Sequence, residues 1–74
     1  MMDDENIHEA WYYKVLDFAV HMIDRFQEKE EKGWSGYSEI SEEEYQKRAI
    51  KNIRQGSYVD AANLCLLAWR RKNV

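Results

Sequence analysis

The chain has 74 residues, of which 45% are hydrophobic and 14% aromatic, and its formal net charge is −3. This length predicts a single domain, residues 1–74, and the acidic balance argues against nucleic acid or anionic membranes as partners. The sequence also has no signal peptide, no membrane-length apolar run, no second cysteine for a disulfide and no Cys/His cluster with zinc spacing, so we expect a cytoplasmic protein.

Apolar residues near the start of the chain recur at helical spacing and predict a helix over about residues 6–32. They form two adjacent stripes, which make a face wide enough to contact more than one neighbour. Gly33 is expected to end this helix, because glycine readily adopts the left-handed conformation found just after many helices. The first stripe is Trp11, Val15, Phe18, Met22 and Phe26, and the second is Tyr12, Leu16, Ala19 and Ile23.

A second, shorter helix is predicted over about residues 41–55. Ser41 and Glu44 have the spacing of a capping box, in which each side chain accepts a hydrogen bond from the backbone of the other. The run Glu42–Glu44 resembles a metal site, but consecutive helical side chains diverge by about 100°, so we interpret it as part of the helix start. The side chains expected to be buried are Tyr45, Ala49, Ile50 and Ile53.

The third helix, predicted over about residues 57–72, has almost no polar face. Between Val59 and Trp69 only Asp60 and Asn63 are polar, and their spacing puts them on one side of the helix. A helix that is apolar nearly all round belongs in a core or an oligomer interface. Asp60 is expected either to form a capping box with Ser57 or to face the interior beside Asn63. We therefore expect an all-α fold, in which this three-helix unit packs as an oligomeric helical bundle.

Three segments of the chain resemble a known family. They are Phe18-Ala19-x-x-Met22-x-x-Arg25-Phe26, Lys32-Gly33-Trp34 and Val59-Asp60-Ala61-Ala62-Asn63-Leu64-Cys65-Leu66-Leu67. These segments are similar to the small MazG-like proteins of phages and bacteria, which belong to the all-α nucleoside triphosphate pyrophosphohydrolases. The resemblance covers roughly residues 15–70.

The resemblance implies a helical bundle that dimerises and uses acidic side chains to hold magnesium against a triphosphate. The family places these acids in a Glu-Glu-x-x-Glu motif on one helix and a Glu-x-x-Asp motif at the start of the next. Here the second motif aligns on Asp60 with Ser57 in place of its glutamate, and Lys51, Asn52 and Arg54 stand in the region of the first. Because magnesium requires hard oxygen ligands, we interpret the chain as a reduced relative of the family.

These departures favour a non-enzymatic, oligomeric binding or regulatory protein with no catalytic residues and no cofactor. Basic side chains bind anions directly, so exchanging acids for bases would leave a site for an anion such as a nucleotide. A homodimer or higher homo-oligomer is expected, because a monomer of this size cannot bury all the apolar faces. The candidate ligand-binding residues are Asp60, Asn63, Lys51, Arg54 and Trp34.

Two alternative functions remain open at this point. A magnesium-dependent (d)NTP pyrophosphohydrolase would combine Glu42–Glu44 with Asp60, and its candidate metal ligands are Asp60 and Glu44. A protein-binding inhibitor of a host enzyme or defence system would instead dock through an exposed aromatic patch around Trp34 and Tyr37. Hydrolysis of dNTPs would distinguish the first alternative from a binding protein.

Overall fold

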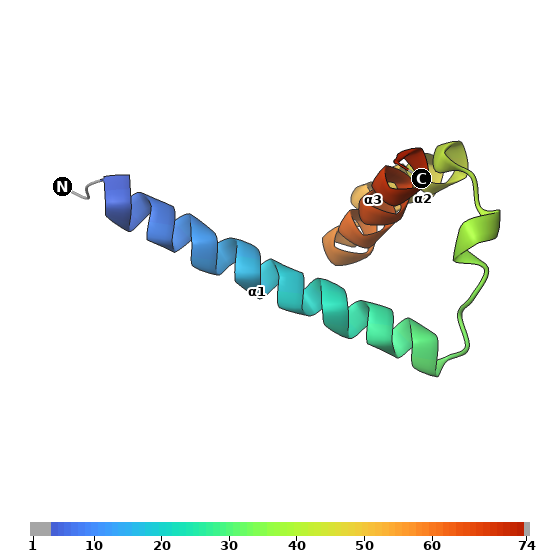
Figure 1. Ribbon diagram of the computed structural model, residues 1–74, viewed down its shortest axis with the longest axis horizontal. Helices are drawn as coiled ribbons and strands as arrows, with labels where there is room; N and C mark the ends of the chain where they lie inside the picture. The colour runs from blue at the N-terminus through green and yellow to red at the C-terminus, as the bar shows by residue number, and fades with distance from the viewer. Residues whose placement is uncertain (1–3, 74) are drawn as a thin grey trace.

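Within residues 4–73, which the computed structural model describes, the chain forms three α-helices and a short 3-10 turn (Figure 1). The side chains of residues 4–9 are not described. The elements are α1 (Asp4–Glu31), η1 (Tyr37–Glu39), α2 (Glu42–Arg54) and α3 (Tyr58–Lys72). The predicted all-α class and three-helix unit are confirmed. No helix of the described residues is both long and apolar enough to cross a membrane.

Two glycines end α1 and α2 in the same way. Gly33 and Gly56 have φ values of 81° and 76°, so both adopt the left-handed conformation, which was predicted for Gly33. After α1, the backbone N–H of Trp34 donates to the carbonyl of Lys29 (2.9 Å), and after α2 that of Ser57 donates to Asn52 (2.8 Å). These bonds satisfy carbonyls that have no partner inside their helix, and they set the direction in which the chain leaves each helix.

The two predicted capping boxes have different outcomes. Ser41 Oγ accepts a hydrogen bond from the backbone N–H of Glu44 (3.1 Å), as expected. The Glu44 carboxylate, however, contacts Arg48 one turn further along α2. The prediction of a capping box at Ser57 is wrong, because the Ser57 side chain makes no capping hydrogen bond. The carboxylate of Asp60 accepts a hydrogen bond from Arg25 of α1 instead.

The core lies where α2 and α3 pack against each other. Its most buried side chain is Tyr45, which is 1% exposed and donates a hydrogen bond to the carbonyl of Tyr37 (2.6 Å). The other buried residues are Ala49, Ala61, Asn63 and Leu67. The expectation that Ile50 and Ile53 are buried is wrong, since both are 50% exposed. Ile50 lies about 100° round the helix from Ala49 and therefore points away from α3.

α1 packs on α3 only through its C-terminal half, and its N-terminal half projects away from the other helices (Figure 1). The molecule is consequently 49 Å long, and its radius of gyration is 15.0 Å. A compact domain of this length has a radius of gyration of about 11 Å. Many large apolar residues of α1 remain exposed, among them Trp11, Tyr12, Tyr13, Val15, Leu16, Phe18, Val20 and Ile23.

Candidate ligand-binding site

Asp60 is held by an arginine from α1. Arg25 Nε donates to Asp60 Oδ1 (2.8 Å), and a longer bond joins Nη2 to Oδ2 (3.4 Å). Arg25 Nη1 also contacts Glu28 Oε2 at 2.7 Å. The hydrogen bonds to Asp60, and secondarily to Glu28, raise the pKa of Arg25 above its ordinary value, so the guanidinium stays charged. The polar face of α3 therefore carries an ion pair that links it to α1.

Asn63 is the second polar residue of this face and is almost completely buried. It is 2% exposed, and its Nδ2 donates to the backbone carbonyl of Met22 on α1 (3.1 Å). No group of the described residues donates a hydrogen bond to its Oδ1, which is buried. A buried amide oxygen is costly to leave unpaired. The prediction that Asp60 and Asn63 share a face is confirmed.

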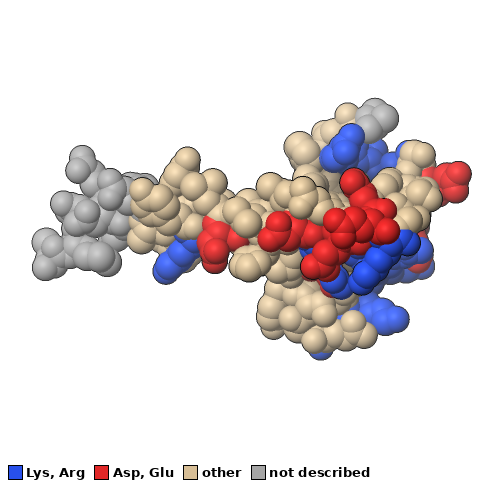
Figure 2. All heavy atoms as spheres, turned by 90° about the horizontal axis from the view of Figure 1, so that it is seen from below, with Lys and Arg blue, Asp and Glu red and all other residues tan. Residues whose placement is uncertain are grey.

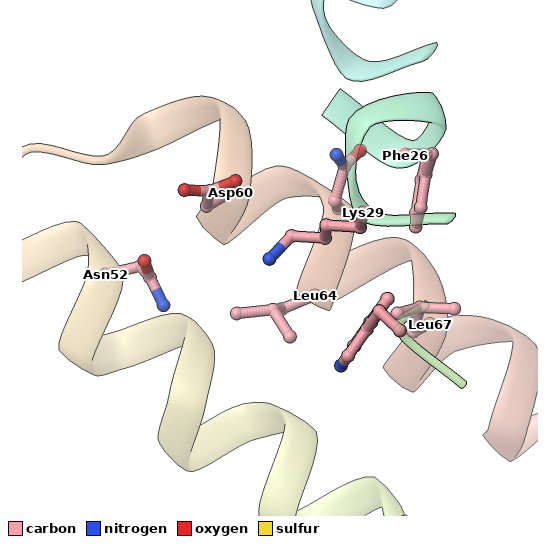
Figure 3. Close-up of a pocket in the computed structure, with 8 residues that line it drawn as sticks. Phe26, Lys29, Asn52, Asp60, Leu64 and Leu67 are labelled. Atoms are coloured by element: carbon pink, nitrogen blue, oxygen red, sulfur yellow. The ribbon is translucent and has the colours of Figure 1, made fainter. Parts of the chain in front are cut away.

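Asp60 and Asn63 line a small depression of about 70 Å³ between the three helices (Figure 3). Figure 3 shows Lys29 extending from α1 across this space, with Asn52 on the α2 side and Leu64 on α3. Trp34 closes another side of the depression. The depression is too small for a nucleotide, but it opens beside a larger one that shares several of its lining residues.

The larger depression, which we call the basic groove, has a volume of about 390 Å³. Three cationic side chains border it, Lys29 from α1 and Arg48 and Lys51 from α2. Lys29 Nζ lies 5.0 Å from the centre of the Trp34 ring, and Arg48 Nε lies 3.1 Å from Glu44 Oε1. Lys51 has no ion pair among the residues with described side chains. The remaining lining residues are Trp34, Asn52, Gln55 and Leu64.

The structure thus brings together four of the five candidate binding residues. Asp60, Asn63 and Trp34 line the small depression, and Trp34 with Lys51 lines the basic groove. Arg54 lies in the last turn of α2 and lines neither depression.

Sequence reasoning missed Arg25, Lys29, Arg48, Asn52 and Gln55. One signal for Arg25 was available, because it follows Met22 by three residues and therefore borders the apolar stripe of α1. Lys29 lies a further turn along the same side of the helix. A signal for Arg48 and Gln55 was also available, because they lie three residues before and four residues after the candidate Lys51 and therefore share its face of α2.

The two candidate metal ligands are each engaged by a different arginine. Asp60 binds Arg25 and Glu44 binds Arg48, so a cation would compete with a guanidinium at either carboxylate. Among the residues whose side chains are described, no group of three or more His, Cys, Asp or Glu could hold a metal ion. Comparison with protein-family models gave no match, and neither did comparison with curated proteins or with solved structures.

Proposed function

We propose that this chain is a small cytoplasmic, non-enzymatic protein that binds a nucleotide or a similar phosphate-bearing ligand in the basic groove. The observation that carries the proposal is the arrangement of three cations and one indole ring around a single depression. Its volume of about 390 Å³ lies in the range of small-molecule sites. The resemblance to phage and bacterial MazG-like proteins supports a nucleotide as the ligand and a degenerate pyrophosphohydrolase as the scaffold.

The residues that line the basic groove can contact both the phosphates and the base of a nucleotide. Lys51 and Arg48 would donate hydrogen bonds to phosphate oxygens, and Lys51 has no acidic partner among the described side chains. Such charge-assisted hydrogen bonds are stronger than those between neutral groups. Trp34 offers a flat apolar surface on which a base can stack. The Gln55 amide provides donors and an acceptor for the polar edge of a base. The Asn52 amide already donates one hydrogen bond to the carbonyl of Arg48 (2.8 Å) and provides its oxygen as an acceptor.

Binding without hydrolysis is supported by the charges at the site. Metal-assisted phosphate chemistry needs carboxylates that hold the cation against the triphosphate. The carboxylate of Asp60 is already paired with Arg25, whose guanidinium would repel a divalent cation. Lys29 and Lys51 add further positive charge at the groove. An anion can be held by these groups directly, and no metal is needed to cancel its charge.

The alternative of an inhibitor docking through Trp34 and Tyr37 finds less support. The two rings pack edge to face with centroids 4.4 Å apart, and both residues are only partly exposed. Aromatic side chains are more exposed on α1, where Trp11 and Tyr12 are 61% and 62% exposed. The exposed aromatic residues therefore favour a protein-binding surface on α1 over one around Trp34 and Tyr37.

Calorimetric titration of the chain with dNTPs in the absence of magnesium tests the proposal. We expect saturable binding that Lys51→Ala weakens about 10-fold or more, the usual loss for a hydrogen bond to a charged group. Lys47→Ala is the matched control, because Lys47 lies exposed on the same helix and lines neither depression. Absence of saturable heat for every dNTP, or equal weakening by both variants, would contradict the proposal.

A second assay addresses the enzyme alternative. The chain is incubated with mixed dNTPs and magnesium, and released pyrophosphate is measured. We expect no release above that of a sample without protein. Pyrophosphate release that Asp60→Asn abolishes would show that the carboxylate still serves a metal and that the chain is an enzyme.

A further inference from the structure

Two apolar strips of the chain face solvent, one on α1 and one on α3. The α1 strip consists of Tyr12, Leu16, Ala19 and Ile23, and its three large residues are 62%, 44% and 55% exposed. The α3 strip consists of Tyr58, Ala62, Cys65 and Trp69, on the side of α3 opposite the buried Asn63 and Leu67. Tyr58 and Trp69 are each 62% exposed. In Figure 2 the described part of α1 nearest its N-terminus is mostly tan, with basic and acidic side chains along one side of it.

We infer that the α1 strip of one chain packs antiparallel on the α3 strip of a second copy, and that the contact is made twice in a symmetric dimer. Both strips belong to the same chain, so a second copy supplies the complement of each. Such a two-fold arrangement closes on itself and leaves neither strip uncovered.

The exposed area of the chain supports a partner of this size. The chain exposes 6186 Å², whereas a compact monomer of 8.9 kDa exposes about 4,800 Å². The excess of about 1,400 Å² exceeds the roughly 800 Å² that each partner buries in a standard interface. Association can therefore bury a full interface while leaving an ordinary amount of surface on each copy.

The spacing of the two strips is the same, since the residues of each are separated by four, three and four positions. This series reads the same in both directions, so the order of small and large residues distinguishes the two. In the antiparallel direction the two alanines meet near the centre, where they permit close approach of the helix axes. The resulting pairs are Tyr12 with Trp69, Leu16 with Cys65, Ala19 with Ala62 and Ile23 with Tyr58.

The charges at the ends of the helices favour the same direction. Residues 4–9 contain three acids and no lysine or arginine. The last turn of α3 contains Arg70, Arg71 and Lys72. An antiparallel pairing brings these opposite charges to the same end of the contact and also opposes the two helix dipoles.

Disulfide mapping tests the pairing residue by residue. Leu16→Cys places a thiol opposite Cys65 of the second copy, whereas Asp17→Cys places it on the polar face of α1. Under mild oxidation at micromolar concentration, we expect Leu16→Cys to give a species of twice the chain mass in denaturing, non-reducing gels. Mass spectrometry of its peptides should identify a bond between positions 16 and 65. Asp17→Cys should give little of the corresponding bond between positions 17 and 65.

A charge substitution measures the strength of the contact. Leu16→Glu places a carboxylate at the centre of the interface, and we expect the dimer association constant to fall by about 30-fold or more, as at an interface hot spot. Lys14→Glu on the polar face is the matched control and should leave association unchanged. Helix content measured by circular dichroism should be the same in both variants at concentrations where they are folded monomers.

Three results would overturn the inference. The first is equal cross-linking of positions 16 and 17 to Cys65. The second is a dimer that Leu16→Glu leaves intact, which would place the interface elsewhere. The third is a wild-type chain that stays monomeric at every accessible concentration, which would leave the α1 strip to an unrelated protein. None of these results depends on nucleotide binding, so the basic groove is tested separately.

Discussion

The two halves of α1 have similar apolar patterns but different surroundings. Met22 and Phe26, in the C-terminal half, lie against α3 and are partly covered. Val15 and Tyr12, in the N-terminal half, are more than 60% exposed. The difference follows from length, since α1 has 28 residues whereas α2 and α3 have 13 and 15. At 1.5 Å per residue α1 is about 20 Å longer than either partner.

This comparison shows that an apolar stripe predicts a contact surface without identifying what covers it. Inside the chain α3 covers only the part of the stripe that it reaches. The remaining part keeps the composition of a core while facing solvent, which is unusual for a chain that works alone. The buried half of the molecule fixes the fold, and the projecting half is the part through which we expect the chain to assemble.

The largest difference in stability is expected between truncation of a leucine in the core and truncation of a leucine in the projecting half of α1. Leu67, at 8% exposure, belongs to the core, so Leu67→Ala should lower the free energy of unfolding by about 2–4 kcal/mol. Leu16→Ala should change it by less than about 0.5 kcal/mol at concentrations where the chain is monomeric. Urea unfolding followed by circular dichroism measures both values. Equal losses in dilute solution would contradict the distinction between the two halves.

A smaller effect is expected at Tyr45, the most buried side chain of the core. Tyr45→Phe removes the hydrogen bond to the carbonyl of Tyr37 and should cost about 1 kcal/mol. Tyr58→Phe is the control, since Tyr58 is 62% exposed and should tolerate the change. The same denaturant titration measures both variants, and a loss at Tyr58 equal to that at Tyr45 would contradict the assignment.

The same tyrosine predicts how stability depends on alkaline pH. Burial raises the pKa of the Tyr45 phenol above its ordinary value, so the folded state binds this proton more tightly than the unfolded state. Its contribution to stability is fully present below the unfolded pKa of about 10 and is lost as the pH rises through the folded pKa. Unfolding measured across this range should show a steeper decline for the wild type than for Tyr45→Phe. Parallel curves would contradict the prediction.

The smallest effect is expected at the ion pair that joins α3 to α1. Asp60→Asn should cost about 0.2–1 kcal/mol, because Arg25 is 39% exposed and keeps Glu28 as a partner. Thermal melting with and without magnesium provides the measurement, and magnesium should leave both melting temperatures unchanged. A magnesium-dependent rise in the wild type that Asp60→Asn abolishes would mean that Asp60 binds a metal.

Local signals in the sequence were sufficient for the three helices and several of their ends. Gly33 marked the end of α1 and Ser41 marked the start of α2, because each acts on backbone groups only a few residues away. Burial was predicted less well. Ile50 and Ile53 are as apolar as core residues, but their exposure depends on where α3 lies relative to α2, which the spacing within one helix does not specify.

The candidate site was only partly predictable for the same reason. The shared face of Asp60 and Asn63 follows from helical spacing alone. The partner of Asp60 does not, since Arg25 lies 35 positions away and reaches it only because α1 crosses α3 at that level. Ser57 has the spacing of a capping residue, but its expected partner Asp60 forms a stronger, charge-assisted hydrogen bond with Arg25 of α1. The basic groove likewise combines side chains from α1 and α2.

Sedimentation equilibrium of the wild-type chain over a range of micromolar concentrations tests the central claim most directly. If the projecting half of α1 is covered by a second copy, the apparent mass should rise with concentration to twice the 8.9 kDa of one chain. The Leu16→Glu variant should remain near the mass of one chain over the same range. A wild-type chain that sediments only as the 8.9 kDa species would contradict the account.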